Sequence, residues 1–160
     1  MSEEFHFFWG SNFSQWAPSP FVIGGVAYCC AEQYMMAEKA RLFGDMGIEE
    51  RIMGTSDPAE HQRLGKAVRG FNDSVWKAKA KQIVWKGSWA KYTQNEDLKT
   101  ELLATGNKTI VEASATDCLW GIGLKASDSR AHSRSTWRGT NWLGEILTEI
   151  RNRIRSLGAV

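Results

Sequence analysis

The segment Ala31-Glu-Gln-Tyr-Met-Met-Ala-Glu-Lys-Ala-Arg-Leu-Phe43 predicts an amphipathic helix whose apolar face carries two charged groups. At about 100° per residue, Glu32 and Lys39 fall in one sector of this helix. That sector also holds Met35, Met36, Leu42 and Phe43, and the opposite face carries Gln33, Ala37 and Arg41. An acid and an amine in an apolar stripe are costly to bury unless each finds a partner. The pattern therefore predicts either a functional carboxylate–amine pair, or a Lys39 that extends to water beside a Glu32 in a surface ion pair.

Length and composition indicate one globular domain over residues 1–160. The chain is 42% hydrophobic and 24% charged, as is usual for a globular protein, and its net charge of +2 is too small to indicate nucleic-acid binding by itself. No apolar run approaches the roughly 20 residues of a membrane span, and the acidic N-terminus does not resemble a signal peptide. Cys29, Cys30 and Cys118 form neither a disulfide framework nor a zinc-ligand spacing. We expect an intracellular, cytoplasmic protein (with the nucleus as a second location in a eukaryote) that uses no membrane, metal or cofactor.

Hydrophobic periodicity along the rest of the chain predicts further helices and a few short strands. Residues 5–9, 21–28 and 109–113 are typical of strands. Helices are expected over 45–54, from Pro58 to about 66, from 73 or 74 to about 92, and after a capping Asn95. The last helix has the clearest apolar repeat, which comprises Leu143, Ile146, Leu147, Ile150, Ile154 and Leu157. The sequence therefore predicts a mainly α fold (α+β to a minor extent), a single-domain helical bundle with a few short β-strands.

The loops between these elements carry groups that a core does not require. They include Ser11 and Asn12, Glu112, Asp117, Trp120-Gly-Ile-Gly123 and Trp137-Arg-Gly-Thr-Asn141. Glycines would let the backbone approach a ligand closely, although the third glycine of a dinucleotide motif is missing. Asn141 could equally cap the last helix, and Glu112 could be a surface residue at a strand end. Tryptophans beside glycine serve either as a flat wall for a planar ligand or as loop anchors.

These groups favour one kind of chemistry. The three histidines are isolated in the sequence, so no Ser/His/Asp set or metal spacing is indicated. A carboxylate–lysine arrangement with aromatic walls suits hydrolysis at an anomeric carbon. There, carboxylates support an oxocarbenium-like state and an acid assists the leaving base.

An ordered set of short motifs carries a family resemblance. The motifs are Ser11-Asn12-Phe13, Glu32-Gln-Tyr34, Lys39-Ala40, Leu102-Leu-Ala-Thr105-Gly106, Glu112-Ala113, Asp117-Cys-Leu-Trp120-Gly121-Ile-Gly123 and Trp137-Arg-Gly139-Thr-Asn141-Trp-Leu143-Gly144. Together they resemble the NADAR (YbiA-like) family of small N-glycosidases over nearly the whole chain. The resemblance implies hydrolysis of a bond between ribose C1 and an exocyclic amine, without a cofactor.

The resemblance also implies roles for individual residues. The implied catalytic residues are Glu32, Lys39, Asp117 and Trp120. The implied substrate contacts are Ser11, Asn12, Phe13, Glu112, Gly121, Gly123, Arg130, Arg134, Trp137 and Asn141. Two roles stay open for Lys39, namely general acid and transient Schiff-base nucleophile. The sequence departs from the family at Gln33, where members often have His, so the role of that His cannot be carried over.

The second departure concerns the substrate. The stretch between Trp120 and Trp137 is longer and more basic than in compact members, and Lys125, Arg130, Arg134 and Arg138 are either phosphate or nucleic-acid contacts or a solvated basic loop. This loop favours ADP-ribosylated guanine as the substrate, as a nucleoside or within DNA or RNA, and hence a role in DNA repair. The alternatives are a ribosylamino-pyrimidine phosphate of the early riboflavin pathway, and a non-catalytic module that binds ADP-ribose or nucleic acid.

Overall fold

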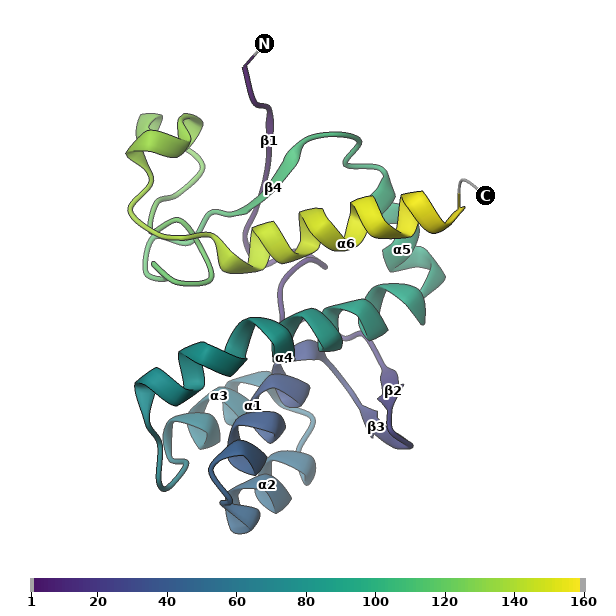
Figure 1. Ribbon diagram of the computed structural model, residues 1–160, viewed down its shortest axis with the longest axis vertical. Helices are drawn as coiled ribbons and strands as arrows, with labels where there is room; N and C mark the ends of the chain where they lie inside the picture. The colour runs from purple at the N-terminus through teal and green to yellow at the C-terminus, as the bar shows by residue number, and fades with distance from the viewer. Residues whose placement is uncertain (1, 159–160) are drawn as a thin grey trace. The chain divides into compact units, whose positions relative to one another are not determined.

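The structure is a computed structural model that describes residues 2–158 in two compact units (Figure 1). Unit 1 combines the chain up to Ser14 with the chain from Asp97 onward, and unit 2 is the continuous segment Gln15–Glu96. The mainly helical fold with a few short strands is confirmed, while the single domain over residues 1–160 stays a prediction. Within residues 2–158, no helix has both the length and the apolar character that crossing a membrane would require.

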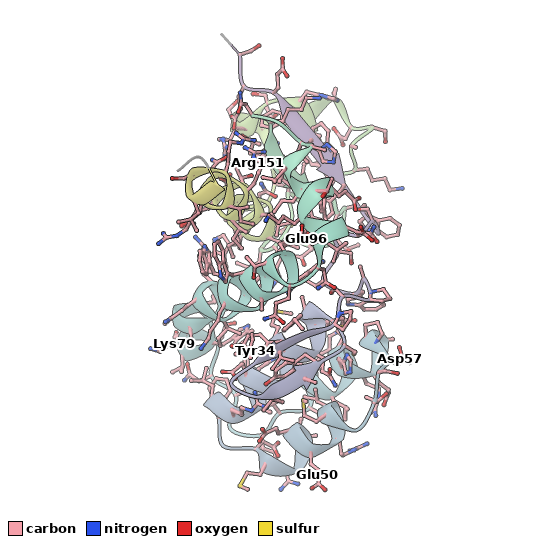
Figure 2. All side chains as sticks on the ribbon, turned by 90° about the vertical axis from the view of Figure 1, so that its right-hand side faces the viewer. Tyr34, Glu50, Asp57, Lys79, Glu96 and Arg151 are labelled. Carbon is pink, nitrogen blue, oxygen red and sulfur yellow. The ribbon has the colours of Figure 1, made fainter. Side chains whose placement is uncertain are left out.

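Unit 2 is built around one central helix. Its elements are β2 (Phe21–Ile23), β3 (Val26–Tyr28), α1 (Ala31–Leu42), α2 (Met46–Met53), α3 (Pro58–Lys66) and α4 (Asp73–Thr93). Helix α1 packs against α2, α3 and α4. Tyr34 of α1, labelled in Figure 2, lies so close to Gly87 of α4 that a Cβ at position 87 would come within 2.7 Å of the Tyr34 ring. Because three helices surround α1, most of its side chains are buried.

Two local expectations for unit 2 are wrong. Residues 21–28 do not form one strand, because Gly24 and Gly25 adopt φ values of 59° and 80° and turn the chain into an antiparallel β2–β3 hairpin. The face of α1 expected to be polar is also buried, with Gln33 only 4% exposed. The Gln33 side chain accepts a hydrogen bond from the Cys29 N–H and donates to the carbonyls of Ile52 and Thr55, which satisfies this buried amide.

Unit 1 joins its N-terminal and C-terminal segments through a parallel strand pair. Strand β1 (Phe5–Phe8) runs beside β4 (Thr109–Glu112), with Phe5 opposite Thr109 and Phe8 opposite Glu112. Helix α6 (Trp142–Gly158) packs against β4. Helix α5 (Glu96–Leu103) precedes β4, and the short 3-10 turns η1 (Ser129–His132) and η2 (Arg134–Thr136) lie in the loop before α6. The chain order therefore places the end of β4 beside the glycine-rich loops.

The predicted apolar repeat of α6 holds except at its end. Leu143, Ile146, Leu147, Ile150 and Ile154 are buried, whereas Leu157 is 62% exposed. The buried face also contains Arg151, which donates to Thr105 Oγ1 and to the carbonyl of Lys108 and so fixes the turn before β4 (Figure 2). Asn95, the expected cap of α5, also ties two segments of unit 2 together, because its side-chain Nδ2 donates to the carbonyls of Pro20 and Lys91.

Candidate functional site

Three segments of unit 1 that are distant in sequence are joined by backbone hydrogen bonds. The N–H of Ile122 donates to the carbonyl of Glu112 at 3.0 Å. The N–H groups of Asn141 and Trp142 donate to the carbonyls of Gly121 and Leu119, each at 3.0 Å. The predicted motifs at 112–113, 117–123 and 137–144 therefore meet at one place in this unit.

Asn141 holds the end of β4 in position. Its side chain is fully buried, and Oδ1 accepts from the Glu112 N–H at 3.0 Å while Nδ2 donates to the Ile110 carbonyl at 3.0 Å. Gly144 gives this amide its space, since a Cβ there would lie 2.3 Å from Asn141 Oδ1. The side chain of Asn141 is thus engaged by the protein, and it acts on the site by positioning Glu112.

The carboxyl group of Glu112 is the most strongly perturbed acid of the site. Its Oε2 atom is buried and has no hydrogen-bond partner among residues 2–158. Burial raises the pKa of Glu112 to about 7, and the negative charge of Asp117 adds to the effect. A Cβ at Gly121 would lie 3.2 Å from Oε2 and 2.8 Å from the Glu112 carbonyl, so the close packing requires glycine there. A carboxyl with this pKa can give or take a proton near neutral pH.

Asp117 organises the turn that presents Trp120. Its Oδ1 atom accepts from the backbone N–H of Leu119 at 3.0 Å and of Trp120 at 2.8 Å. The half-buried Trp120 ring packs edge-on against Trp142, with 5.6 Å between the ring centroids. Gly123 closes the turn with φ of 70°, and a Cβ there would lie 2.8 Å from Cys118 Sγ. The structure therefore gives Asp117 a structural function in addition to any chemistry.

Several predicted substrate contacts of unit 1 are held by the protein itself. Phe13 is 3% exposed and packs edge-on against Phe8, while Ser11 Oγ accepts from the Phe13 N–H. Asn12 is exposed and donates to Glu101 Oε2 at 3.0 Å. Trp137 donates from Nε1 to the Ala131 carbonyl and packs on the core cluster of Val111, Ile122, Leu124 and Ala131. Phe13 and Trp137 therefore anchor loops to the core.

The basic residues of the long loop differ in their partners. Arg134 forms ion pairs with Glu3 and Glu145, and Arg130 forms one with Asp128. Lys125 and Arg138 are exposed and form no ion pair within the described chain. The positive charge without an ion pair therefore lies at Lys125 and Arg138, although Arg138 is close enough to Asp128 to help lower the pKa of that carboxyl. The sequence could not separate these two residues from the two paired arginines.

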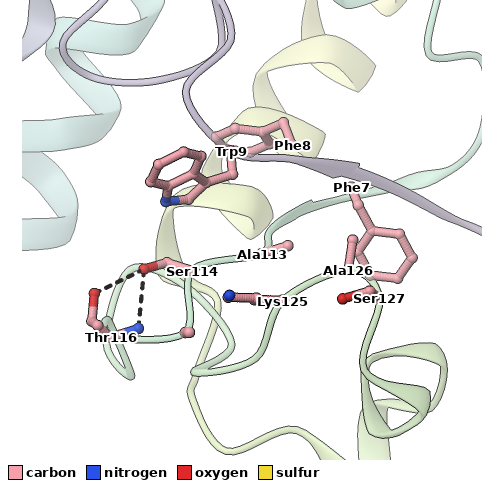
Figure 3. Close-up of a pocket in the computed structure, with 10 residues that line it drawn as sticks. Phe7, Phe8, Trp9, Ala113, Ser114, Thr116, Lys125, Ala126 and Ser127 are labelled. Carbon is pink, nitrogen blue, oxygen red and sulfur yellow. Dashed lines mark hydrogen bonds between the residues drawn. The ribbon is translucent and has the colours of Figure 1, made fainter.

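Two adjoining cavities lie in unit 1. The larger, of about 620 Å³, is lined by Phe7, Phe8, Trp9, Ala113, Ser114, Ala115, Thr116, Lys125, Ala126 and Ser127. Figure 3 shows Trp9 and Lys125 on facing walls of it. The smaller, of about 330 Å³, is lined by Ala115, Gly123, Leu124, Lys125, Ser127, Asp128, Arg130 and Arg138. An aromatic cavity thus shares the wall residues Ala115, Lys125 and Ser127 with a cationic one.

In unit 2, Glu32 is buried and Lys39 is half-buried. Glu32 is 4% exposed, so the alternative of a surface ion pair is wrong. The Lys39 Nζ lies 4.6 Å from the ring centroid of Phe71 and 5.5 Å from that of Trp76. Burial lowers the pKa of Lys39, the charge of Glu32 opposes this shift, and Lys66 reinforces it. The two aromatic rings favour the ammonium form, a contribution for which the sequence offered no signal.

Comparison with known proteins gives the family. The NADAR domain matches residues 7–155. N-glycosidase R617 of Acanthamoeba polyphaga mimivirus is 44% identical over 163 residues, covering 94% of this chain and 96% of the relative. N-glycosidase YbiA of Escherichia coli (strain K12) is 30% identical over 144 residues, covering 90% and 79%. The NMR structure of the E. coli protein YbiA matches with a TM-score of 0.80 at 26% identity, over 99% of this chain and 89% of that one.

The fold, the perturbed carboxyl and the relatives together define the class of protein as a hydrolase, an N-glycosidase. The chain belongs to the NADAR family.

Proposed function

We propose that this N-glycosidase releases ADP-ribose from ADP-ribosylated guanine by hydrolysing the bond between ribose C1 and the exocyclic amine. The observation that carries the proposal is the pair of adjoining cavities in unit 1. ADP-ribose contains a planar base and a diphosphate linker with two negative charges. The aromatic cavity suits the base, and the cationic cavity suits the diphosphate.

The reaction needs only water as a second reactant. The C1–N bond breaks, the leaving amine takes a proton, and a water oxygen bonds to C1 as it loses a proton to a base. Carboxylates stabilise the positive charge that develops at C1, and we propose Asp117 of unit 1 and, as a separate candidate, Glu32 of unit 2 for this function. Glu112 and Lys39 are the groups with perturbed pKa values that can transfer a proton. We propose that no metal ion takes part.

A comparison of substrates tests this proposal. ADP-ribosylated guanosine and a ribosylamino-pyrimidine phosphate are incubated separately with the protein, and product release is followed by chromatography. We expect kcat/KM to be at least tenfold higher for the ADP-ribosylated compound, because only that substrate presents a base and a diphosphate together. A preference for the pyrimidine phosphate would reassign the substrate, and binding without turnover would indicate a non-catalytic module.

A second measurement tests whether the modified guanine is processed within nucleic acid or as a free nucleoside. We propose that the modification is removed from nucleic acid as a repair reaction, and single-stranded DNA and RNA oligonucleotides carrying it are compared with the free nucleoside. Phosphate contacts outside the modified residue raise kcat/KM for an oligonucleotide and make it fall with increasing salt. Equal values for oligonucleotide and nucleoside at all salt concentrations would assign the protein to the free compound.

A further inference from the structure

Two cysteines and a histidine of unit 2 bring their ligand atoms together. The Sγ atoms of Cys29 and Cys30 are 3.8 Å apart, and Cys30 Sγ is 3.8 Å from His61 Nδ1. All three atoms lie within 4.8 Å of one another. Cys30 and His61 are buried, whereas Cys29 is half-buried and gives the cluster access to solvent.

The tautomer of His61 is fixed by its surroundings. Its Nε2 atom lies 2.7 Å from the carbonyl oxygen of Thr55. A carbonyl oxygen can only accept a hydrogen bond, so Nε2 carries the proton. The Nδ1 atom therefore directs a bare lone pair toward the sulfurs. A histidine that ligates a metal ion is oriented in this way, with its other ring nitrogen donating to a backbone carbonyl.

Two of the three separations correspond to those around a tetrahedral zinc ion, and the third, between Cys29 Sγ and the His61 ring nitrogen, is at most 4.8 Å. Zn–S bonds of about 2.3 Å and Zn–N bonds of about 2.0 Å place two sulfurs about 3.8 Å apart, and a sulfur and a nitrogen about 3.5 Å apart. The two separations of 3.8 Å agree with these values to within small side-chain adjustments. The Cys30 side chain makes no capping hydrogen bond to α1, although this residue precedes the helix, so its sulfur is available as a ligand.

We propose that Cys29, Cys30 and His61 bind one Zn²⁺ ion as thiolate, thiolate and imidazole. Water completes the tetrahedron on the side of Cys29. The ion joins the start of α1 to α3 and stabilises unit 2, and it takes no part in the glycosidase reaction. The site is independent of the substrate proposed above.

Cobalt substitution tests the site directly. The reduced full-length protein is stripped with a chelator, dialysed and titrated with Co²⁺ while absorption is recorded. We expect thiolate-to-cobalt charge-transfer bands and tetrahedral d–d bands that saturate at one equivalent, and that one equivalent of Zn²⁺ removes. Zn²⁺ also raises the melting temperature of the stripped protein.

Three variants make the assignment specific. Cys29→Ser and His61→Gln each weaken Co²⁺ binding at least tenfold and abolish the rise in melting temperature. Cys118→Ser, which alters an exposed cysteine of unit 1, retains both. Far-ultraviolet circular dichroism checks the fold of every variant, and Cys29→Ser carries the test if His61→Gln unfolds, since Cys29 is only half-buried. The proposal is overturned if the reduced parent shows no charge-transfer band, or if Cys29→Ser or a folded His61→Gln binds Co²⁺ like the parent.

Discussion

The buried carboxyl of Glu112 makes the stability of the protein depend on pH. Its pKa of about 7 in the folded chain lies above the value of 4.5 for an exposed glutamate, so the folded state binds more protons between these values. Stability therefore falls as pH rises through this window, and the lost contribution is restored only at lower pH. Between pH 5 and pH 8, Glu112→Gln should gain about 2–3 kcal/mol of stability relative to the parent, because the amide never ionises.

Urea unfolding of the parent and of Glu112→Gln at both pH values measures this difference, and shared titrations cancel in the comparison. A difference that does not change with pH would mean that the Glu112 carboxylate is well solvated in the folded protein.

Lys39 offers a direct test of its chemistry. Lys39→Ala should abolish most turnover, and Lys39→Arg separates the two roles because it keeps the charge but not an amine nucleophile. If the amine displaces the base from C1 and the ring opens to an imine, borohydride added during turnover reduces the imine to a stable adduct. Peptide mass spectrometry then finds the added mass on Lys39.

A parent enzyme that gives no adduct, with an inactive Lys39→Ala, would assign Lys39 to the acid or electrostatic role. Lys79→Ala is the matched control, because it removes an exposed amine of unit 2 that is not among the charges acting on Lys39. Full activity in Lys39→Ala would remove this residue from the mechanism.

The long loop before α6 carries basic residues that form ion pairs and basic residues that do not. Lys125→Ala and Arg138→Ala should raise KM by several-fold with little change in kcat, because phosphate contacts bind ground and transition states alike. Arg134→Ala is the internal control, since its guanidinium pairs with Glu3 and Glu145 and the residue lines neither cavity. Steady-state kinetics on the ADP-ribosylated substrate measure all three variants, and a KM effect confined to Arg134→Ala would contradict the assignment of the cationic cavity.

Two substitutions of Asp117 distinguish the structural function of this side chain from the function of its negative charge. Asp117→Asn keeps an oxygen that can accept the N–H groups of Leu119 and Trp120, whereas Asp117→Ala loses both hydrogen bonds and about 1–3 kcal/mol. We expect Asp117→Asn to remain as stable as the parent but to lose most turnover, because it lacks the negative charge near C1. Denaturant melts together with kcat give the answer, and near-normal turnover in Asp117→Asn would limit this residue to its structural function.

Short-range sequence patterns were sufficient to predict the helices whose ends and buried faces depend on neighbouring residues. The Pro58 start of α3 and the apolar face of α6 could be predicted from short-range spacing, and both helices begin and end near the expected residues. The apolar period failed to predict which faces of a helix are buried where other helices surround that helix. Helix α1 buries both its expected faces because it contacts three other helices, and no single-helix period reports that.

The sequence patterns could not predict contacts between segments that are distant in the chain. The sequence predicted Glu112 either as a ligand contact or as a surface residue at a strand end, because its burial depends on the later Gly121 turn and on Asn141. Likewise, Cys29, Cys30 and His61 have no recognisable ligand spacing, and their atoms meet only when α3 packs beside α1. Residue identity indicated which chemistry to expect, and the fold determined which groups have the environment for it.

Metal removal should separate stability from catalysis in the intact enzyme. Treatment with excess chelator should lower the melting temperature but leave turnover unchanged at a temperature well below unfolding, because the reaction uses carboxylates, an amine and water. Calorimetry and product release are measured on the same chelated sample. Loss of turnover that one equivalent of a divalent ion restores, in a protein that is still folded, would contradict a metal-free reaction.

The parallel pairing of β1 with β4 also affects how the chain acquires its structure during synthesis. Unit 2 is continuous in sequence, so its contacts can form soon after Glu96 has left the ribosome. Strand β1 is made before unit 2, whereas its partner at Thr109–Glu112 and the helix that packs on that partner are made after it. The phenylalanines of β1 therefore stay unpaired while unit 2 is translated, and a chaperone would be of most use to the nascent chain in this interval.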